Sequence, residues 1–106
     1  MELVVKLYEL STLLPKEEKY GLRSQITRAA ISIPSNIAEG SAKNSKKDIK
    51  RFLEMALGSA FELETQLLII QKLKYSTSIP VTPIIDSLRE EQKMINGYMK
   101  SLMTNS

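Results

Sequence analysis

The chain has 106 residues, of which 42% are hydrophobic and 25% charged, and its formal net charge is +3. This composition is ordinary for one globular domain, and so mild a positive charge permits nucleic-acid or acidic partners without requiring them. Because the sequence has no cysteine and no histidine, disulfides, thiol nucleophiles, Ser-His-Asp catalysis and the histidine-containing di-iron site of helical bundles are excluded. We therefore expect a protein that is not an enzyme, with no catalytic residues, no cofactor and no metal.

No segment is apolar over the length of about 18 residues that a membrane-spanning helix needs. The opening residues, MELVVK, lack the basic start and the uninterrupted apolar core of a signal peptide. We therefore expect a cytoplasmic protein with no membrane partner.

Apolar residues at helical spacing predict a first helix over residues 2–14, which Pro15 ends. A second helix is expected over residues 16–39. Inside it, Pro34 has no N–H group and its ring clashes with the carbonyl of Ala30, which predicts a kink or a break. Gly40 then suits the left-handed position that ends a helix.

The third helix is expected over residues 46–74, because Ser45 and Asp48 have the spacing of a capping box and a broad apolar stripe follows. Thr82 as N-cap and Pro83 as first helical residue predict a fourth helix over residues 83–103. Four amphipathic helices joined by short loops indicate an all-α, antiparallel up-down-up-down four-helix bundle, forming a single domain over residues 1–106.

A polar stripe runs beside the apolar stripe of the second helix. Its members recur every three or four positions and so stack along the helix axis: Gln25, Arg28, Ser32, Asn36 and Glu39. The short turn that follows brings Arg28 level with residues 58–62, so we expect Arg28 to pair with Glu62 or Glu39 in a partly buried network. The small residues at 58–60 would let the two helices approach closely. We interpret this network as setting the register of the bundle; a binding role is the alternative.

The motif at residues 25–40, Q-I-x-R-A-A-x-S-I-P-x-N-I-A-E-G, closely resembles the signature of a known family. These are small four-helix-bundle proteins first noticed as products of intervening sequences in bacterial 23S ribosomal RNA genes, and their relatives include the accessory protein of diversity-generating retroelements. The resemblance covers nearly the whole chain. It implies the same bundle fold, a ring-like homo-oligomer that is often a pentamer, and an RNA or reverse-transcriptase partner.

Five positive charges fall within nine positions, opposed only by Asp48: Lys43, Lys46, Lys47, Lys50 and Arg51. Such clusters attract phosphate backbones, so these are the candidate nucleic-acid-binding residues, for RNA or DNA. The cluster has no interleaved aromatic residues, which argues against stacking on bases and favours contacts to backbone and shape. The alternative is a solvated end of the bundle that keeps the protein soluble.

Three further apolar residues, Leu57, Phe61 and Leu68, lie away from the main stripe of the third helix. Exposed apolar patches usually mark an interface, so these are the candidate oligomer interface, with a wide core stripe as the alternative. The resemblance favours a homo-pentamer, in which five basic clusters would gain from multivalency.

The predicted function is a non-catalytic nucleic-acid-binding protein, accessory to an RNA or reverse-transcriptase complex. A structural or protein-interaction scaffold without a nucleic-acid role is the alternative. A third interpretation, a carboxylate-based metal hydrolase, would need several carboxylates to converge from Glu39, Glu54, Glu62 and Glu64.

Overall fold

The computed structural model describes residues 2–18, 21–75 and 78–104, and within these ranges the chain forms helices and no strand. The α-helices are α1 (Glu2–Thr12), α2 (Leu22–Ser41), α3 (Lys46–Lys72) and α4 (Val81–Thr104), and a short 3₁₀ helix, η1 (Lys16–Glu18), precedes α2. The expected all-α fold class is therefore confirmed. None of the helices in these ranges combines the length and apolar character that crossing a membrane requires.

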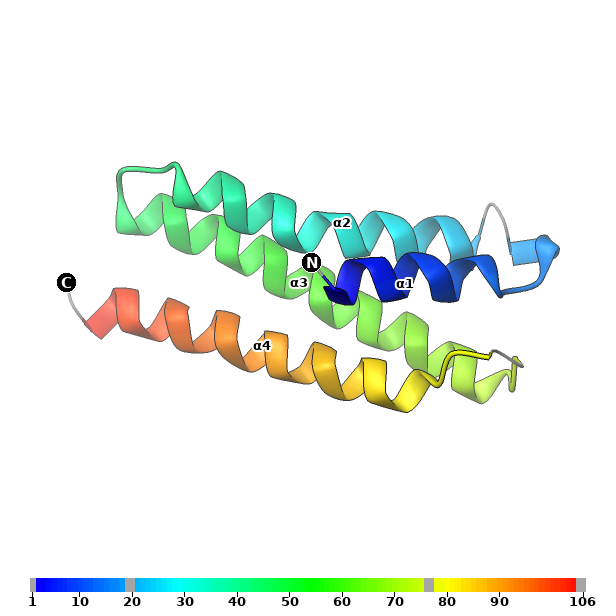
Figure 1. Cartoon of the computed structure of the whole chain (residues 1–106). Helices are drawn as coiled ribbons and strands as arrows, with labels where there is room; N and C mark the ends of the chain where they lie inside the picture. Colours follow the sequence, from blue (N-terminus) through cyan, green and yellow to red (C-terminus); the bar gives the residue numbers. More distant parts are fainter. Residues whose placement is uncertain (1, 19–20, 76–77, 105–106) are drawn as a thin grey trace.

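The helices lie side by side in an elongated molecule measuring 48 × 23 × 20 Å (Figure 1). The contact between α2 and α3 is the most extensive, followed by α3 with α4 and α1 with α2, while α1 meets α4 only briefly. Over the described residues α2 does not pack on α4, nor α1 on α3, so these pairs lie on the diagonals of a four-helix arrangement. Figure 1 shows the α2–α3 turn and the C-terminal end of α4 at one end of the molecule, and η1 at the other.

Apolar residues from all four α-helices form one core. The largest fully buried side chains come from every helix: Leu7, Leu10, Ile26, Leu53, Leu63, Leu67, Ile70 and Leu88. Burying one such side chain contributes about 1.5–3 kcal/mol relative to leaving it in water. The apolar stripes of the sequence therefore face inward and supply the main stabilising term.

The helix bounds differ from the predicted ones at all four helices, and most at the second. Gly21 has φ −103° and ψ −104°, outside the helical region, and precedes α2 without a side-chain cap. Because glycine neither favours a helix nor offers a capping group, the predicted helix over 16–39 is divided into η1 and α2. In α4 the helix already begins at Val81, and the Thr82 hydroxyl accepts a hydrogen bond from Gln71 Nε2 at 3.0 Å. The first and third helices each end two residues earlier than predicted.

Pro34 does not break α2, which continues through it to Ser41. The turn of α2 that contains Pro34 has an additional hydrogen bond from a side chain, since Asn36 Nδ2 donates to the Ser32 backbone oxygen at 2.9 Å. The predicted left-handed end at Gly40 is wrong: Gly40 lies inside α2 and its φ is not positive. A Cβ added to Gly40 would lie 3.0 Å from Phe52 Cβ, so glycine is needed there for close helix packing.

Candidate nucleic-acid interface

The candidate interface begins where α3 begins. Ser45 has extended backbone, with φ −105° and ψ 145°, and its hydroxyl accepts a hydrogen bond from the Asp48 backbone N–H at 3.1 Å. Such an N-cap stabilises a helix by about 1 kcal/mol, and Asp48 in the first turn suits the positive end of the helix. The predicted cap is confirmed, and it fixes the basic residues on the preceding turn and on the first two turns of α3.

Two of the five basic residues are arranged around one aromatic ring. Lys43 Nζ and Arg51 Cζ each lie 5.1 Å from the centroid of the half-buried Phe52 ring. Lys43 also forms an ion pair with Glu39, at 3.6 Å. Cation–π contacts at exposed sites contribute about 0.5–1 kcal/mol each, so Phe52 orients both cations. The role of Phe52 beside these two cations was not predicted, although its position directly after Arg51 was the available signal.

The other three basic residues surround a hollow at the end of the molecule. Lys46, Lys47 and Lys50 line a volume of about 310 Å³ together with Leu102 and Met103 from the last turns of α4. Lys46 and Lys47 are exposed and Lys50 is half-buried. The structure therefore places all five predicted residues at one end of the molecule. Two acidic residues lie close to them in the sequence, Asp48 and Glu39, and Glu39 forms the ion pair with Lys43.

The polar stripe of α2 makes a smaller network than predicted. Ser32 Oγ lies 2.8 Å from Ser59 Oγ of α3, and Asn36 Nδ2 donates to Ser32 Oγ at 2.9 Å. These bonds join α2 to α3 at one level. Gly58, by contrast, is exposed and has nothing within 4 Å of an added Cβ. Of the small residues predicted to allow close approach, Ser59 therefore contacts α2 and Ala60 is buried, whereas Gly58 takes no part; Gly40 of α2 is a further small residue at this contact.

The predicted ion pair of Arg28 is wrong. Arg28 and Gln25 are exposed, and among the described residues Arg28 forms no ion pair. Glu39 pairs with Lys43 instead, and Glu62 accepts a hydrogen bond from Gln66 Nε2 at 3.2 Å. The reason is the rotation of α2 about its axis, which turns Ser32 toward α3 and leaves Arg28 in solvent.

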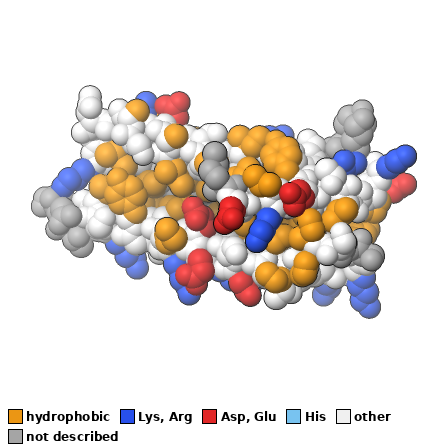
Figure 2. All heavy atoms as spheres, viewed as in Figure 1, with side chains coloured by type: hydrophobic (Ala, Val, Ile, Leu, Met, Phe, Trp, Pro, Cys, Tyr) orange, Lys and Arg blue, Asp and Glu red, His pale blue; other side chains and the backbone are white. Residues whose placement is uncertain are grey.

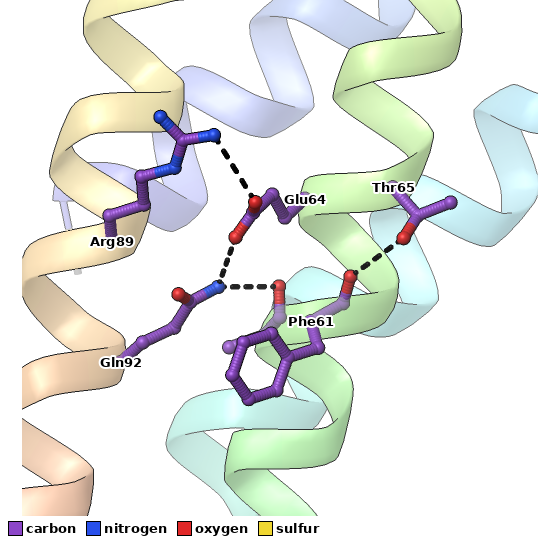
Figure 3. Close-up of polar contacts among 6 residues, drawn as sticks. Phe61, Glu64, Thr65, Arg89 and Gln92 are labelled. Atoms are coloured by element: carbon purple, nitrogen blue, oxygen red, sulfur yellow. Dashed lines mark hydrogen bonds and ion pairs between the residues drawn. The ribbon is translucent and has the colours of Figure 1, made fainter.

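A polar network between α3 and α4 was not predicted (Figure 3). The buried Gln92 donates through Nε2 to Glu64 Oε1 at 2.8 Å and to the Ala60 backbone oxygen at 3.4 Å, and Arg89 Nη2 lies 3.3 Å from Glu64 Oε2. Figure 3 shows Arg89 and Gln92 reaching from α4 to the same carboxylate. The available signal was a glutamine among the apolar residues of α4, between Leu88 and Ile95.

The candidate carboxylates do not form a metal site. Within the described ranges no group of three or more His, Cys, Asp or Glu residues is placed to hold an ion. Glu64 is engaged by Arg89 and Gln92, and Glu62 by Gln66.

The three candidate interface residues on α3 separate into two kinds. Leu57 is half-buried and packs against the core. Phe61 and Leu68 are 52% and 42% exposed. An apolar surface on α3 is therefore available to a partner at Phe61 and Leu68, with Leu57 at its edge.

A comparison with curated protein sequences finds no match to this chain. The model of one protein family, described as 23S rRNA-intervening sequence protein, matches residues 1–97. The matched region includes α1, α2, α3, the basic residues at the start of α3 and most of α4. The chain belongs to the family of 23S rRNA-intervening sequence proteins.

Proposed function

We propose that this protein is a non-catalytic, oligomeric four-helix bundle that binds the phosphate backbone of RNA or DNA through its basic end. One observation carries the proposal: five cationic residues gather at one end of the molecule, at Lys43, Lys46, Lys47, Lys50 and Arg51. The architecture we propose is antiparallel, up-down-up-down, with α2 kinked at Pro34, and the compartment is the cytoplasm.

The kind of contact follows from the side chains. Lysine ammonium groups act as point charges that bind phosphates without reading bases. Phe52 already has Lys43 and Arg51 against its ring, so it supports the cluster instead of offering a stacking platform for bases. We therefore expect binding that depends strongly on salt and weakly on sequence.

Assembly would strengthen such binding. The exposed Phe61 and Leu68 side chains support a homo-oligomeric interface on α3, and family resemblance favours a homo-pentamer. In a ring, five basic clusters would bind one nucleic acid with a multivalent gain in affinity. By analogy with the retroelement relatives, we propose that such a ring assists an RNA or reverse-transcriptase complex; the same Phe61 surface supports a scaffold without nucleic acid as the alternative.

The test is binding of nuclease-treated protein to labelled structured RNA and duplex DNA across a salt series. Counterion release predicts that log K falls linearly with log[salt], with a slope of about −0.9 for each duplex phosphate contacted. Reversing four charges in the K46E/K47E/K50E/R51E variant is expected to abolish binding.

The matched control is the K6E/K16E/K72E/K74E variant, which carries the same change in net charge at exposed positions outside the cluster. It should retain most of the affinity if the basic end is the working surface. Equal losses in both variants would show that net charge alone matters, and absence of binding at low salt would favour the scaffold.

A further inference from the structure

A hollow between α1 and α2 lies away from the basic cluster. It has a volume of about 270 Å³ and is formed where the second half of α1 passes the first turns of α2, toward the η1 end of the molecule (Figure 1). Small-molecule sites have volumes from about 300 Å³ upward, so this hollow suits a small ligand. The residues that line it are polar, and all but one carry a hydroxyl group: Tyr8, Ser11, Thr12, Arg23, Ser24 and Thr27.

Arg23 is the one charged residue among the described residues that line the hollow. Its side chain is half-buried, and within the described ranges it forms no ion pair. Two nearby carboxylates are placed elsewhere, because Glu9 lines a different hollow between α1 and α4, and Glu18 accepts the hydrogen bond from Tyr75. Figure 2 shows basic side chains at both ends of this face of the molecule and acidic side chains mainly in its middle. A guanidinium that is partly withdrawn from water and has no carboxylate partner favours an anionic ligand.

The hydroxyl groups around Arg23 divide into acceptors and donors. The Ser11, Thr12 and Thr27 hydroxyls each donate to a carbonyl oxygen of their own helix, at distances from 2.7 to 3.1 Å. Because a hydroxyl has a single proton, these three oxygens are left to accept hydrogen bonds from a ligand. The Tyr8 and Ser24 hydroxyls make no hydrogen bond to any described residue, so they are able to donate. A matching ligand therefore has an anionic group and hydroxyl groups of its own.

We propose that this hollow binds a sugar phosphate. Arg23 pairs with the phosphate oxygens, the anionic group that its planar fork of N–H donors matches best, and Tyr8 and Ser24 donate to the same group. Thr12 and Thr27 accept hydrogen bonds from the sugar hydroxyls, which inorganic phosphate lacks. The proposal goes beyond nucleic-acid binding by the basic end and does not depend on it.

The test is a titration of ribose 5-phosphate into ¹⁵N-labelled protein, followed by the NMR signals of the backbone amides. The signals of Arg23, Ser24 and Thr27 are expected to shift, in the native protein and equally in the K46E/K47E/K50E/R51E variant. Binding should be at least about fivefold tighter than that of inorganic phosphate, because the sugar adds hydrogen bonds. Since this readout is local to α2 and persists without the basic cluster, failure of this proposal and failure of nucleic-acid binding are distinguishable.

Two arginines of α2 supply a matched pair of variants. Arg23→Gln is expected to weaken binding of ribose 5-phosphate at least about tenfold, because it removes the charge that pairs with the phosphate. Arg28→Gln is the control, since Arg28 is exposed, forms no ion pair within the described ranges and does not line the hollow. Thr27→Val, which keeps the shape of the side chain, should reduce the preference for ribose 5-phosphate over inorganic phosphate. Equal losses in the two arginine variants, unshifted signals at residues 23–27, or equal affinity for ribose 5-phosphate and inorganic phosphate would overturn the proposal.

A sugar phosphate has two sources, a free small molecule and the end of an RNA chain, and a competition experiment separates them. A 5′-phosphorylated RNA trinucleotide is added to the protein loaded with ribose 5-phosphate. Displacement at the Arg23 and Ser24 signals would support the site and assign its ligand to RNA. Binding of ribose 5-phosphate that the trinucleotide does not displace would support the site and assign it to a free sugar phosphate.

Discussion

Gly40 connects the packing of the bundle to the arrangement of the basic residues. It is buried, and its missing side chain leaves room for Phe52 on the next helix. Phe52 in turn has Lys43 and Arg51 against its ring. One glycine therefore determines how closely α2 approaches α3 and where two of the five cations lie.

Gly40→Ala is expected to destabilise the protein. Alanine gains about 1 kcal/mol of helix propensity over glycine, but a Cβ placed 3.0 Å from Phe52 Cβ overpacks the contact, which typically costs about 1–3 kcal/mol. The matched control is Gly97→Ala on α4, where an added Cβ meets nothing within 4 Å and the propensity gain stands alone. Urea unfolding should show a lower free energy for Gly40→Ala and a higher one for Gly97→Ala. A similar rise in both would show that the Gly40 contact relaxes freely.

The hydrogen-bond and ion-pair partners of single polar residues could be predicted only where both partners are close in the sequence. The Ser45 cap depends only on residues three positions apart, so local sequence is sufficient to predict it. The partners of Arg28 and Gln92 depend on how each helix is rotated against its neighbour. That rotation is set by the packing of whole helices, and a stripe of polar residues at helical spacing does not determine which of them reach across.

Tyr75, just beyond the end of α3, joins that helix to η1. Its hydroxyl donates to Glu18 Oε2 at 2.9 Å, across 57 positions of sequence. This hydrogen bond raises the pKa of Tyr75 above its usual 10.0, and desolvation and the negative charges of Glu18 and Glu17 act in the same direction. Because the pKa is higher in the folded state than in the unfolded state, the contribution to stability is present in full below pH 10 and is lost as pH rises through the folded-state pKa.

The Tyr75→Phe variant tests this linkage. The variant should be less stable than the native protein at neutral pH, because the bond to Glu18 is missing. The two free energies of unfolding should converge above about pH 10, where the native protein loses that bond by ionisation. Urea unfolding at a series of pH values measures the difference, and lysine titration cancels between the two proteins. A difference that stays constant through alkaline pH would contradict the assigned hydrogen bond.

At the level of helices, the sequence was sufficient to predict the four α-helices and their apolar faces, but it predicted the residues at which they begin and end less well. The apolar residues whose spacing predicts each helix are also the residues that fill the core, so the predicted apolar faces agree with the observed buried faces. Helix ends depend on weaker local preferences. Lys74 shows this at the end of α3, where its backbone adopts a φ of 57°. Its backbone N–H donates to the Gln71 carbonyl oxygen, and the backbone N–H of Tyr75 donates to the Ile70 carbonyl oxygen. Glycine is usual at this position, so a lysine there gives no signal for a helix end.

At the level of the whole molecule, the feature that bears on function is the uneven distribution of charge. The five basic residues all fall beside the turn that joins α2 to α3. The basic cluster could be predicted from the sequence because its five members lie within nine positions. The network of Gln92, Glu64 and Arg89 could not be, because it joins residues of two helices that are brought together only when the bundle forms.

The exposed apolar surface of α3 leads to a prediction about assembly. Phe61 and Leu68 are 52% and 42% exposed, and covering them by a second copy would remove apolar area from water. We expect light scattering to give a mass several times the 12.0 kDa of one chain, with five copies for the favoured homo-pentamer. The F61E/L68E variant should have the mass of a single chain, because two buried carboxylates without partners strongly oppose association.

The matched control for assembly is Met94→Glu on α4, a side chain that is 68% exposed and lies on another helix. It should leave the mass unchanged. If the basic clusters act together in a ring, the F61E/L68E variant should also bind nucleic acid far more weakly while every cationic residue remains in place, because the multivalent gain is lost. A single-chain variant with undiminished affinity would show that one basic end is sufficient, and an oligomer that survives the substitutions would place the interface on another face of the bundle.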